Sequence, residues 1–377
     1  MWRTIPPLTD RLAIERLFEM LQFSRTSASS SFEAQNAALE AADDFFGSSA
    51  PKPKFETVVD ADGTEALLVV PDTADLGTCI VYFHGGGYCI GSPKSERGLV
   101  LRIAKSLSVP VLVPDYRKAP SHPAPAAVID ASRCIRWVTG GGLADVLRVG
   151  RGGSSDVIQV AGEGPAHGSR QSLADAVGEA GGEEAAGGSA DEKQPVAARI
   201  VLGGSSAGAG LAMAAYLYST GKHDMERYGY ARQHADAERE VRARIVGIFS
   251  ITGWFDVSNS SPSIRELEGK DPLLDPQLME SFAAAYVPSG MSRKDPLVSP
   301  LYADLSFLPP VRLDWAGGDS LRDDSRRMYE ALVRAGIPVE GIEWEQMPHI
   351  FPYFEPVLEE ARRYLCLELP SWFARLG

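Results

Sequence analysis

The stretch that most constrains how this 377-residue chain can fold is residues 199–216, where an apolar run meets a helix-forming run. Ile200 to Leu202 predicts a short buried strand, and the Ala-, Leu- and Met-rich residues from Ala207 predict a helix. Between them, residues 204–208 read Gly-Ser-Ser-Ala-Gly, which is a Gly-x-Ser-x-Gly pattern. A serine on such a tight turn is held in a strained conformation with its hydroxyl exposed above the sheet. The pattern therefore nominates Ser206 as a nucleophile, although ordinary glycine- and serine-rich turns also match it.

The composition is that of a globular protein and excludes several classes of partner. Hydrophobic residues make up 44% and charged residues 23% of the chain, and the formal net charge is −13. An acidic surface attracts neither nucleic acid nor an anionic membrane, so neither is expected as a partner. No run approaches the roughly 20 apolar residues of a membrane span, and the first residues lack the apolar core of a secretory signal.

The four cysteines are scattered without the spacing of a metal site. Cys79 and Cys134 lie in apolar surroundings and are expected to be buried thiols rather than disulfide partners. A reducing, cytoplasmic setting is therefore expected. Neither a metal ion nor a cofactor is expected.

Apolar patterns alternate between strands and helices, which predicts an α/β fold with a mostly parallel sheet covered on both faces. Eight strands are expected, at residues 55–60, 66–70, 78–83, 110–114, 200–202, 245–251, 311–316 and 339–345. Helices are expected at residues 95–107, 125–138, 207 onward, 278–286, 322–335 and 355–367.

Two regions depart from this alternation. Residues 8–23 predict an amphipathic helix that packs on the main body or forms part of a lid, and residues 24–50 are expected to be partly helical at best. Residues 139–195 are rich in Gly, Ala, Ser and acidic residues, and from 161 onward they contain almost no large apolar side chains. Such a segment cannot bury enough surface to offset its ordering entropy, so a flexible low-complexity insertion is predicted. A docking or regulatory segment is the alternative.

A serine hydroxyl needs a base, and chain order selects the candidate among the six histidines. In the strand–turn–helix architecture the partners follow the serine in the order carboxylate, then histidine. His223 and His234 follow Ser206 within a charged helical stretch, with no strand-end carboxylate before them. His349 lies on a loop directly after an expected strand and is the predicted general base, with a surface loop histidine as the alternative.

The carboxylate that orients the base is expected past the end of the strand at 311–316, where open α/β sheets place their sites. Asp319 occupies that loop. Asp323 and Asp324 are alternatives, but they are better placed to serve the positive N-terminus of the next helix.

Backbone N–H groups for a developing oxyanion are expected from His84-Gly85-Gly86-Gly87-Tyr88, which follows the apolar strand at 78–83. Three glycines let the backbone approach a substrate, together with the N–H of Ala207 after the nucleophile. His84 itself is expected to hold this loop by hydrogen bonds rather than to act as a base.

Together these motifs resemble the hormone-sensitive-lipase branch of the α/β-hydrolase family, carboxylesterases with a His-Gly-Gly-Gly motif. The resemblance spans residues 55–138 and 196–370, and is carried by residues 84–87, 115–125, 204–208, 295–300, 319–324 and 347–349. It implies a triad of Ser206, Asp319 and His349. The oxyanion hole would come from Gly86, Gly87 and Ala207, and the Asp-Tyr-Arg segment at 115–117 would be structural.

The resemblance also implies a domain plan. Residues 51–377 would form the catalytic domain, while residues 1–50 and the helices of 255–295 would form a cap over the substrate. Two departures stand out: Ser205 occupies a position that is usually acidic in the family, and the insertion at 139–195 is unusually long. A modest local effect is expected from the first.

The expected function is hydrolysis of small or short-chain, partly apolar esters through an acyl-enzyme. The candidate substrate-binding residues, for which ordinary core packing is the alternative, are Tyr88, Ser205, Trp254, Phe255, Phe282 and Tyr286. A lactonase, an amidase or a natural-product deacetylase would use the same residues. A non-catalytic receptor of this fold lacks the triad histidine, which is present here. The expected partner is a small-molecule ester, and a homo-oligomer is left open.

Overall fold

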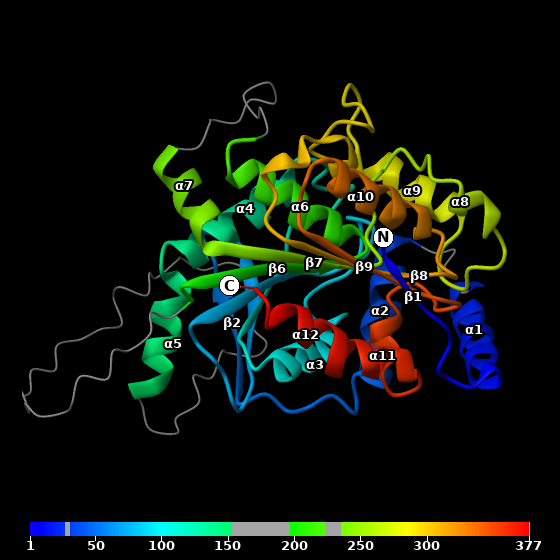
Figure 1. Cartoon of the computed structure of the whole chain (residues 1–377), viewed down its shortest axis with the longest axis horizontal. Coiled ribbons are helices and arrows are strands. Elements are labelled where there is room, and N and C mark those ends of the chain that lie inside the picture. Colours follow the sequence, from blue (N-terminus) through cyan, green and yellow to red (C-terminus); the bar gives the residue numbers. More distant parts are fainter. Residues whose placement is uncertain (27–30, 153–196, 223–234, 377) are drawn as a thin grey trace, which may run out of the picture.

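The computed structural model describes residues 1–26, 31–152, 197–222 and 235–376, and a nine-stranded sheet forms its centre (Figure 1). The strand order is β1-β9-β8-β7-β6-β4-β5-β3-β2. In this order, the seven strands from β1 across to β5 are parallel to their neighbours. Strand β3 pairs antiparallel with both β5 and β2. The strands are β1 (Arg3–Ile5), β2 (Phe55–Asp60), β3 (Glu65–Val70), β4 (Thr78–Phe83), β5 (Val111–Pro114), β6 (Arg199–Ser205), β7 (Ile245–Ile251), β8 (Val311–Ala316) and β9 (Val339–Trp344).

The α/β prediction is confirmed, and all eight expected strands are present. The ninth, β1, escaped the sequence pattern because it is only three residues long and only Ile5 of them is buried. It adds to the edge of the sheet by pairing with β9.

The strands are apolar on both faces because helices cover the sheet on both sides. Along β4, Cys79, Val81 and Phe83 pack into one core, while Ile80 and Tyr82 pack into the other. This alternation follows from the two-residue period of a strand. A continuous apolar run is therefore required at the centre of the sheet.

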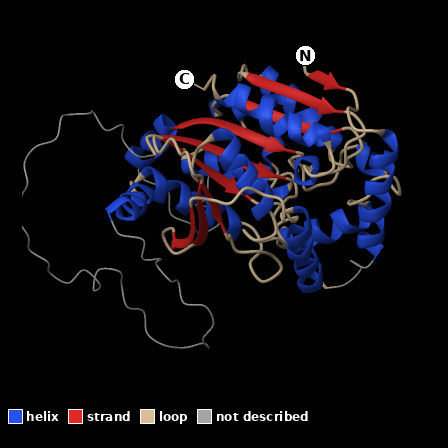
Figure 2. Ribbon diagram, turned by 90° about the horizontal axis from the view of Figure 1, so that it is seen from below, coloured by secondary structure: helices blue, strands red, loops and turns tan. Residues whose placement is uncertain are grey.

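One face is covered by α4 (Ala126–Thr139), α6 (Ala207–Ser219) and α10 (Arg322–Arg334). The other is covered by α3 (Arg97–Leu107), α11 (Glu359–Arg363) and α12 (Leu369–Phe373) (Figures 1 and 2). The expected helix at 355–367 is wrong in its bounds. The chain is extended at Leu358, so α11 begins only at Glu359 and then widens into the π-helical turn η6 (Tyr364–Glu368) before α12.

The N-terminal region contains two helices. They are α1 (Arg11–Thr26), in place of the helix expected at 8–23, and the 15-residue α2 (Phe32–Phe46), so residues 24–50 are partly helical, as expected. The side chain of Ser31 accepts a hydrogen bond from Ala34 N–H and caps α2. The N–H groups of Leu8 and Thr9 donate to Glu360, which ties this region to α11.

The predicted insertion begins with an ordered element. Helix α5 (Gly142–Gly152) buries Leu143 and Leu147, so flexibility is wrong for its first part. The rest of the insertion, with His167, lies outside the described residues. So do His223 and His234 in the charged helical stretch after Ser206, of which α7 (Ala235–Arg244) is described.

The expected cap region contains α8 (Ser263–Glu266) and α9 (Pro276–Tyr286), and the short 3₁₀ turns η3 (Pro300–Tyr302), η4 (Leu305–Phe307) and η5 (Phe351–Phe354) complete the described helices.

The expectations for cysteines, metal sites and membrane spans can be compared with the described residues. All four cysteines are free thiols, and Cys79 and Cys134 are buried as expected. Over the same residues, no group of three metal-ligating side chains gathers, and no helix combines the length and the apolar character needed to cross a membrane. The cytoplasmic setting stays a prediction.

Candidate active site

The turn between β6 and α6 holds Ser206 in the conformation that its sequence pattern predicts. Ser206 has φ 52° and ψ −123°, a backbone region that non-glycine residues rarely occupy. The strain is held by neighbours: its N–H donates to Ile251 O at 2.9 Å, and its carbonyl accepts from Trp254 N–H at 2.9 Å. Both flanking glycines are required, because a Cβ on Gly204 would lie 2.5 Å from the backbone of Gly208, and a Cβ on Gly208 would lie 2.0 Å from Phe83 O.

Asp319 and His349 lie beyond the ends of neighbouring strands and are paired. Their strands β8 and β9 run parallel to β6, so all three carboxyl ends meet at one edge of the sheet. Asp319 Oδ2 is 2.8 Å from His349 Nδ1, and both residues are buried. Asp319 Oδ1 accepts the N–H of Leu321 at 2.8 Å, which orients the carboxylate. The order in the chain and the pairing in space therefore select the same two residues.

The charge environment favours the protonated form of His349. Burial alone would lower the pKa of His349, but the charge and hydrogen bond of Asp319 outweigh it, with further contributions from Asp271 and Glu96. The pKa of His349 is consequently raised above 6.5. Asp271, which sequence reasoning missed, is buried and accepts the N–H of Ser320 at 2.7 Å beside Asp319.

The glycine loop after β4 has an unusual backbone. Gly86, Gly87 and Tyr88 all have positive φ, at 110°, 59° and 62°. Within the described part of the chain, no protein acceptor is found for the N–H groups of Gly86 and Gly87, whereas Gly85 N–H donates to Glu96. Two donors in a buried loop are thus available to a bound group.

His84 supports this loop, as expected from the sequence. Its Nδ1 lies 2.7 Å from Gly85 O, its ring stacks on Tyr116 at 4.3 Å, and the Tyr116 hydroxyl donates to His84 O at 2.8 Å. Burial lowers the pKa of His84 to about 3, so the ring is neutral. Arg117, in the same segment, is held by Asp130 through two bonds of 2.8 Å. The structural role expected for the Asp-Tyr-Arg segment fits these contacts.

Ser205 is placed differently from its sequence prediction. It was expected to contact substrate, but its side chain is fully buried and donates to the carboxylate of Glu96 at 2.7 Å. Ser205 is the last residue of β6, before the turn at Ser206, and its hydroxyl reaches Glu96 at the start of α3. Glu96 lies 109 positions earlier in the chain, so no local pattern could have linked the two.

Comparison with known proteins gives the family. Residues 80–353 match the sequence profile of a family described as having the alpha/beta hydrolase fold. The chain belongs to the alpha/beta hydrolase family.

Two relatives illustrate this membership. The chain is 27% identical to an acetyl-hydrolase of Streptomyces hygroscopicus, over 96% of each chain. It is 28% identical to the carboxylesterase NlhH of Mycobacterium tuberculosis, over 75% of this chain and 69% of that one.

A solved structure of an esterase from the bacterial hormone-sensitive lipase family has the same fold. It superimposes with a TM-score of 0.71 at 23% identity and covers 98% of this chain and 99% of that one. Together, the similarities support an ester-hydrolysing enzyme of the alpha/beta hydrolase family, the class that the sequence predicted.

Aromatic side chains of the predicted cap lie against the glycine loop of this hydrolase. A Cβ on Gly87 would be 2.4 Å from the ring of Phe282, so that ring rests directly on the Gly87 backbone. Phe32 stacks on Phe282 with ring centroids 5.7 Å apart, and Tyr88 stacks on Tyr286 at 3.8 Å. Helix α9, the start of α2 and the glycine loop therefore meet at this point.

The two remaining aromatic candidates occupy different places. Trp254 is buried, lies 6.0 Å from the Tyr88 ring and touches the nucleophile turn through its backbone. Phe255 is fully buried, and its ring fills the space that a side chain at Gly253 would need. The prediction that Phe255 contacts substrate is therefore wrong. Phe255 packs in the core, which was the alternative given for it in the sequence analysis.

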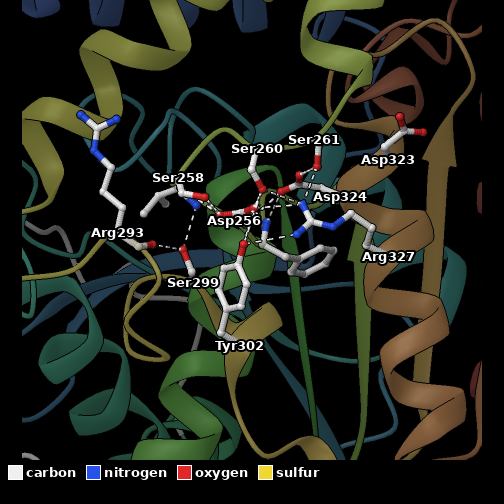
Figure 3. A network of polar contacts seen from close by, with 12 residues as sticks. Asp256, Ser258, Ser260, Ser261, Arg293, Ser299, Tyr302, Asp323, Asp324 and Arg327 are labelled. Atoms are coloured by element: carbon white, nitrogen blue, oxygen red, sulfur yellow. Dashed lines mark hydrogen bonds and ion pairs between the residues drawn. The ribbon is translucent and has the colours of Figure 1, made fainter.

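A polar network fixes the loop that carries these two residues (Figure 3). The buried carboxylate of Asp324 accepts the N–H groups of Phe255 and Asp256, each at 2.9 Å, and also binds the hydroxyl of Ser261. Burial raises the pKa of Asp324 to about 7, against the hydrogen bond of Ser261, and the charge of Asp256 adds to the rise. Asp324 thus anchors a loop rather than the first turn of its own helix.

Asp256 extends the network toward the surface. It accepts hydrogen bonds from Arg327 and from the hydroxyl of Tyr302, both at 2.9 Å (Figure 3). Asp323, the other alternative to Asp319, accepts the N–H of Ser263 at 3.0 Å. Both alternatives are therefore engaged with the cap region, and Asp319 is the one that binds His349.

A cavity of about 660 Å³ lies behind the strand-end loops, between α1 and the segment after α8. Its lining includes Phe18 of α1, Leu267, Gly318 and Gln346. The lining includes neither Ser206 nor His349, so this cavity is adjacent to the candidate site rather than part of it.

Proposed function

We propose that this hydrolase is a serine carboxylesterase whose triad is Ser206, His349 and Asp319. The observation that carries the proposal is the 2.8 Å pairing of His349 Nδ1 with Asp319 Oδ2, at the edge of the sheet where the strained Ser206 turn also ends. A pair of this kind orients an imidazole for proton transfer to and from a serine.

The pairing determines the protonation pattern that the mechanism needs. Because an ionised carboxylate only accepts hydrogen bonds, His349 Nδ1 carries the proton and Nε2 keeps a free lone pair. Nε2 removes the proton from Ser206 Oγ as that oxygen attacks the ester carbonyl carbon. The imidazolium that forms is stabilised by Asp319, and then protonates the leaving alcohol. Water repeats the cycle on the acyl-enzyme and releases the acid.

The oxyanion of each tetrahedral intermediate is proposed to bind the N–H groups of Gly86, Gly87 and Ala207. The first two have no protein acceptor within the described residues, and Ala207 is the first residue of α6. The N-terminus of a helix favours negative charge, so α6 adds to this stabilisation.

We further propose that the substrates are small-molecule esters with short acyl groups. Phe282 rests on Gly87, and Phe32 packs behind it, so little space is left for a long chain above the glycine loop. Tyr88, Trp254 and Tyr286 are the other proposed lining residues. An acetyl group on a larger natural product is the second candidate, favoured by the similarity to an acetyl-hydrolase over 96% of the chain. Lactones and amides would require the same triad.

The test compares Ser206→Ala with the wild type on p-nitrophenyl esters from acetate to octanoate. Loss of the nucleophile is expected to lower kcat by about 10⁶-fold while the circular dichroism spectrum is unchanged. Ser371→Ala, at an exposed serine of α12, is the matched control and is expected to keep full activity. Hydrolysis that survives in Ser206→Ala would remove the triad assignment, and a preference for octanoate would remove the short-acyl assignment.

A further inference from the structure

Glu96 is a buried carboxylate at the start of α3 that the mechanism above does not use. One oxygen, Oε1, accepts the N–H of Gly85 at 2.6 Å and the hydroxyl of Ser205 at 2.7 Å. The other, Oε2, accepts the hydroxyl of Tyr82 at 2.8 Å and again that of Ser205 at 2.8 Å. Gly85, Tyr82 and Ser205 all donate to Glu96, which is the environment of an ionised carboxylate.

The residues that Glu96 binds are each next to a catalytic segment. Gly85 immediately precedes the two proposed oxyanion donors, and Ser205 immediately precedes Ser206. The packing at this point is close, since a Cβ on Gly85 would lie 3.0 Å from Glu96 Oε1 and 3.2 Å from Ser206 Cβ. The Glu96 side chain therefore joins the loop after β4 to the end of β6. These two segments carry the proposed oxyanion donors and the nucleophile, whose separation matters for catalysis.

We propose that Glu96 is a positioning residue for ester hydrolysis, whose carboxylate holds the oxyanion loop and the nucleophile turn at a fixed separation. The inference rests on the proposed function. Charge-assisted hydrogen bonds to a buried carboxylate are short and directional, which suits them to this purpose. Catalysis by preorganised donors requires that the separation does not relax when charge develops on the substrate.

The negative charge of Glu96 has a second effect, on the base. Together with Asp319 and Asp271 it contributes to the raised pKa of His349. Burial raises the pKa of Glu96 itself above 4.5, against the hydrogen bonds of Ser205, Gly85 and Tyr82, and the charge of Asp43 on α2 adds to the rise. The tyrosines Tyr116 and Tyr353 also face this charge.

The decisive variant is Glu96→Gln, which keeps the shape and removes the charge. Its amide oxygen can still accept the N–H of Gly85, and its NH₂ can donate to the hydroxyl of Tyr82, so folding is expected to survive. We expect kcat to fall about 10- to 100-fold with little change in KM, as for a small misplacement of catalytic groups. The acid limb of the kcat/KM profile is expected to move to lower pH, because one contribution to the raised pKa of His349 is lost.

Two further variants separate positioning from charge. Ser205→Ala removes one donor but keeps the carboxylate, so kcat is expected to fall while the acid limb stays in place. Glu96→Asp retains the charge and is likewise expected to keep the position of the acid limb. Glu360→Gln is the matched control: it is a buried glutamate of α11 whose partners are Leu8 N–H, Thr9 N–H and the Thr9 hydroxyl, none of them in a catalytic segment. It is expected to lower the melting temperature and leave kcat and the acid limb unchanged.

The outcomes distinguish this inference from the proposed function. Active sites are counted with a serine-directed fluorophosphonate, so that kcat refers to folded enzyme. A wild type that neither hydrolyses esters nor reacts at Ser206 overturns both. If the wild type is active and Glu96→Gln has the same kcat and the same acid limb, the role of Glu96 alone is overturned. It is also overturned if Glu360→Gln lowers kcat as much as Glu96→Gln does.

Discussion

The contact between Gly87 and Phe282 can be tested by adding a single methyl group. In Gly87→Ala the new Cβ would lie 2.4 Å from the nearest ring carbon of Phe282, at a residue with φ +59°. Carbon atoms pack at about 3.5–4.0 Å, so the ring has to withdraw by about 1 Å or more. The glycine loop and helix α9 therefore cannot both keep their present positions in this variant.

The expected loss of stability has two parts. Placing a side chain at a left-handed φ costs about 1–2 kcal/mol, and overpacking against the ring costs about 1–3 kcal/mol more. Gly63→Ala is the matched control, because Gly63 has φ +81° and no heavy atom within 4 Å of the added Cβ. We therefore expect about 1–2 kcal/mol for Gly63→Ala and about 2–5 kcal/mol for Gly87→Ala. Urea denaturation measures both free energies of unfolding.

Activity is the second readout of the same variants. Gly87→Ala is expected to lower kcat by about 10²-fold or more, because a displaced backbone N–H is a lost oxyanion donor, whereas Gly63→Ala is expected to keep full activity. In a Phe282→Ala background the extra cost of Gly87→Ala should vanish, leaving only the cost seen at Gly63. The reasoning is refuted if Gly87→Ala costs no more than Gly63→Ala, or if the extra cost persists without the ring.

Two further predictions concern the buried carboxylates. Asp319→Asn is expected to lower kcat about 10⁴-fold and to move the acid limb of the rate to lower pH, since Asp319 holds the pKa of His349 above 6.5; a pH–rate profile with an unchanged limb would contradict this. The folded pKa of Asp324, about 7, exceeds the usual aspartate value of 3.8, so the folded state holds a proton that the unfolded state releases between those pH values. The free energy of unfolding should therefore fall as pH rises from about 4 to about 7, by up to about 1.4 kcal/mol per pH unit. Asp324→Asn should remove this dependence on pH. If the free energy of unfolding of both proteins falls equally with rising pH, the prediction is wrong.

Much of the fold could be predicted because its signals are local. The five consecutive apolar residues of β4 and the mostly apolar residues of β7 favour buried strands between helices, and the glycines around Ser206 favour one specific turn. The same holds for Asp319 and His349, since chain order and strand ends place them before any coordinates are known. Strand β1 carried no such signal, because three residues show no period.

What could not be predicted depends on contacts between distant segments. Ser205 was a candidate substrate residue next to Ser206, but its partner Glu96 comes from the start of α3, a distant segment. Phe255 looked like a pocket residue because it is aromatic, yet its ring fills the space beside Gly253. Asp324 looked like a helix-dipole residue, whereas its carboxylate binds backbone N–H groups almost 70 positions earlier. Residue type does not reveal which of several buried partners a side chain finds.

The pairing of β1 with β9, and of Thr9 with Glu360, has a consequence for the order of events during synthesis. Residues 3–9 are bound by residues more than 330 positions later, so during synthesis they dock only after the intervening chain has been made. Contacts between residues so far apart in the chain form late, because the entropy cost of closing the long loop is offset only when the rest of the sheet has formed. Helices α1 and α2 follow β1 directly, and α2 carries Phe32, which stacks on Phe282. A nascent chain with an already formed Ser206 turn would therefore still lack the Phe32 ring beside the glycine loop.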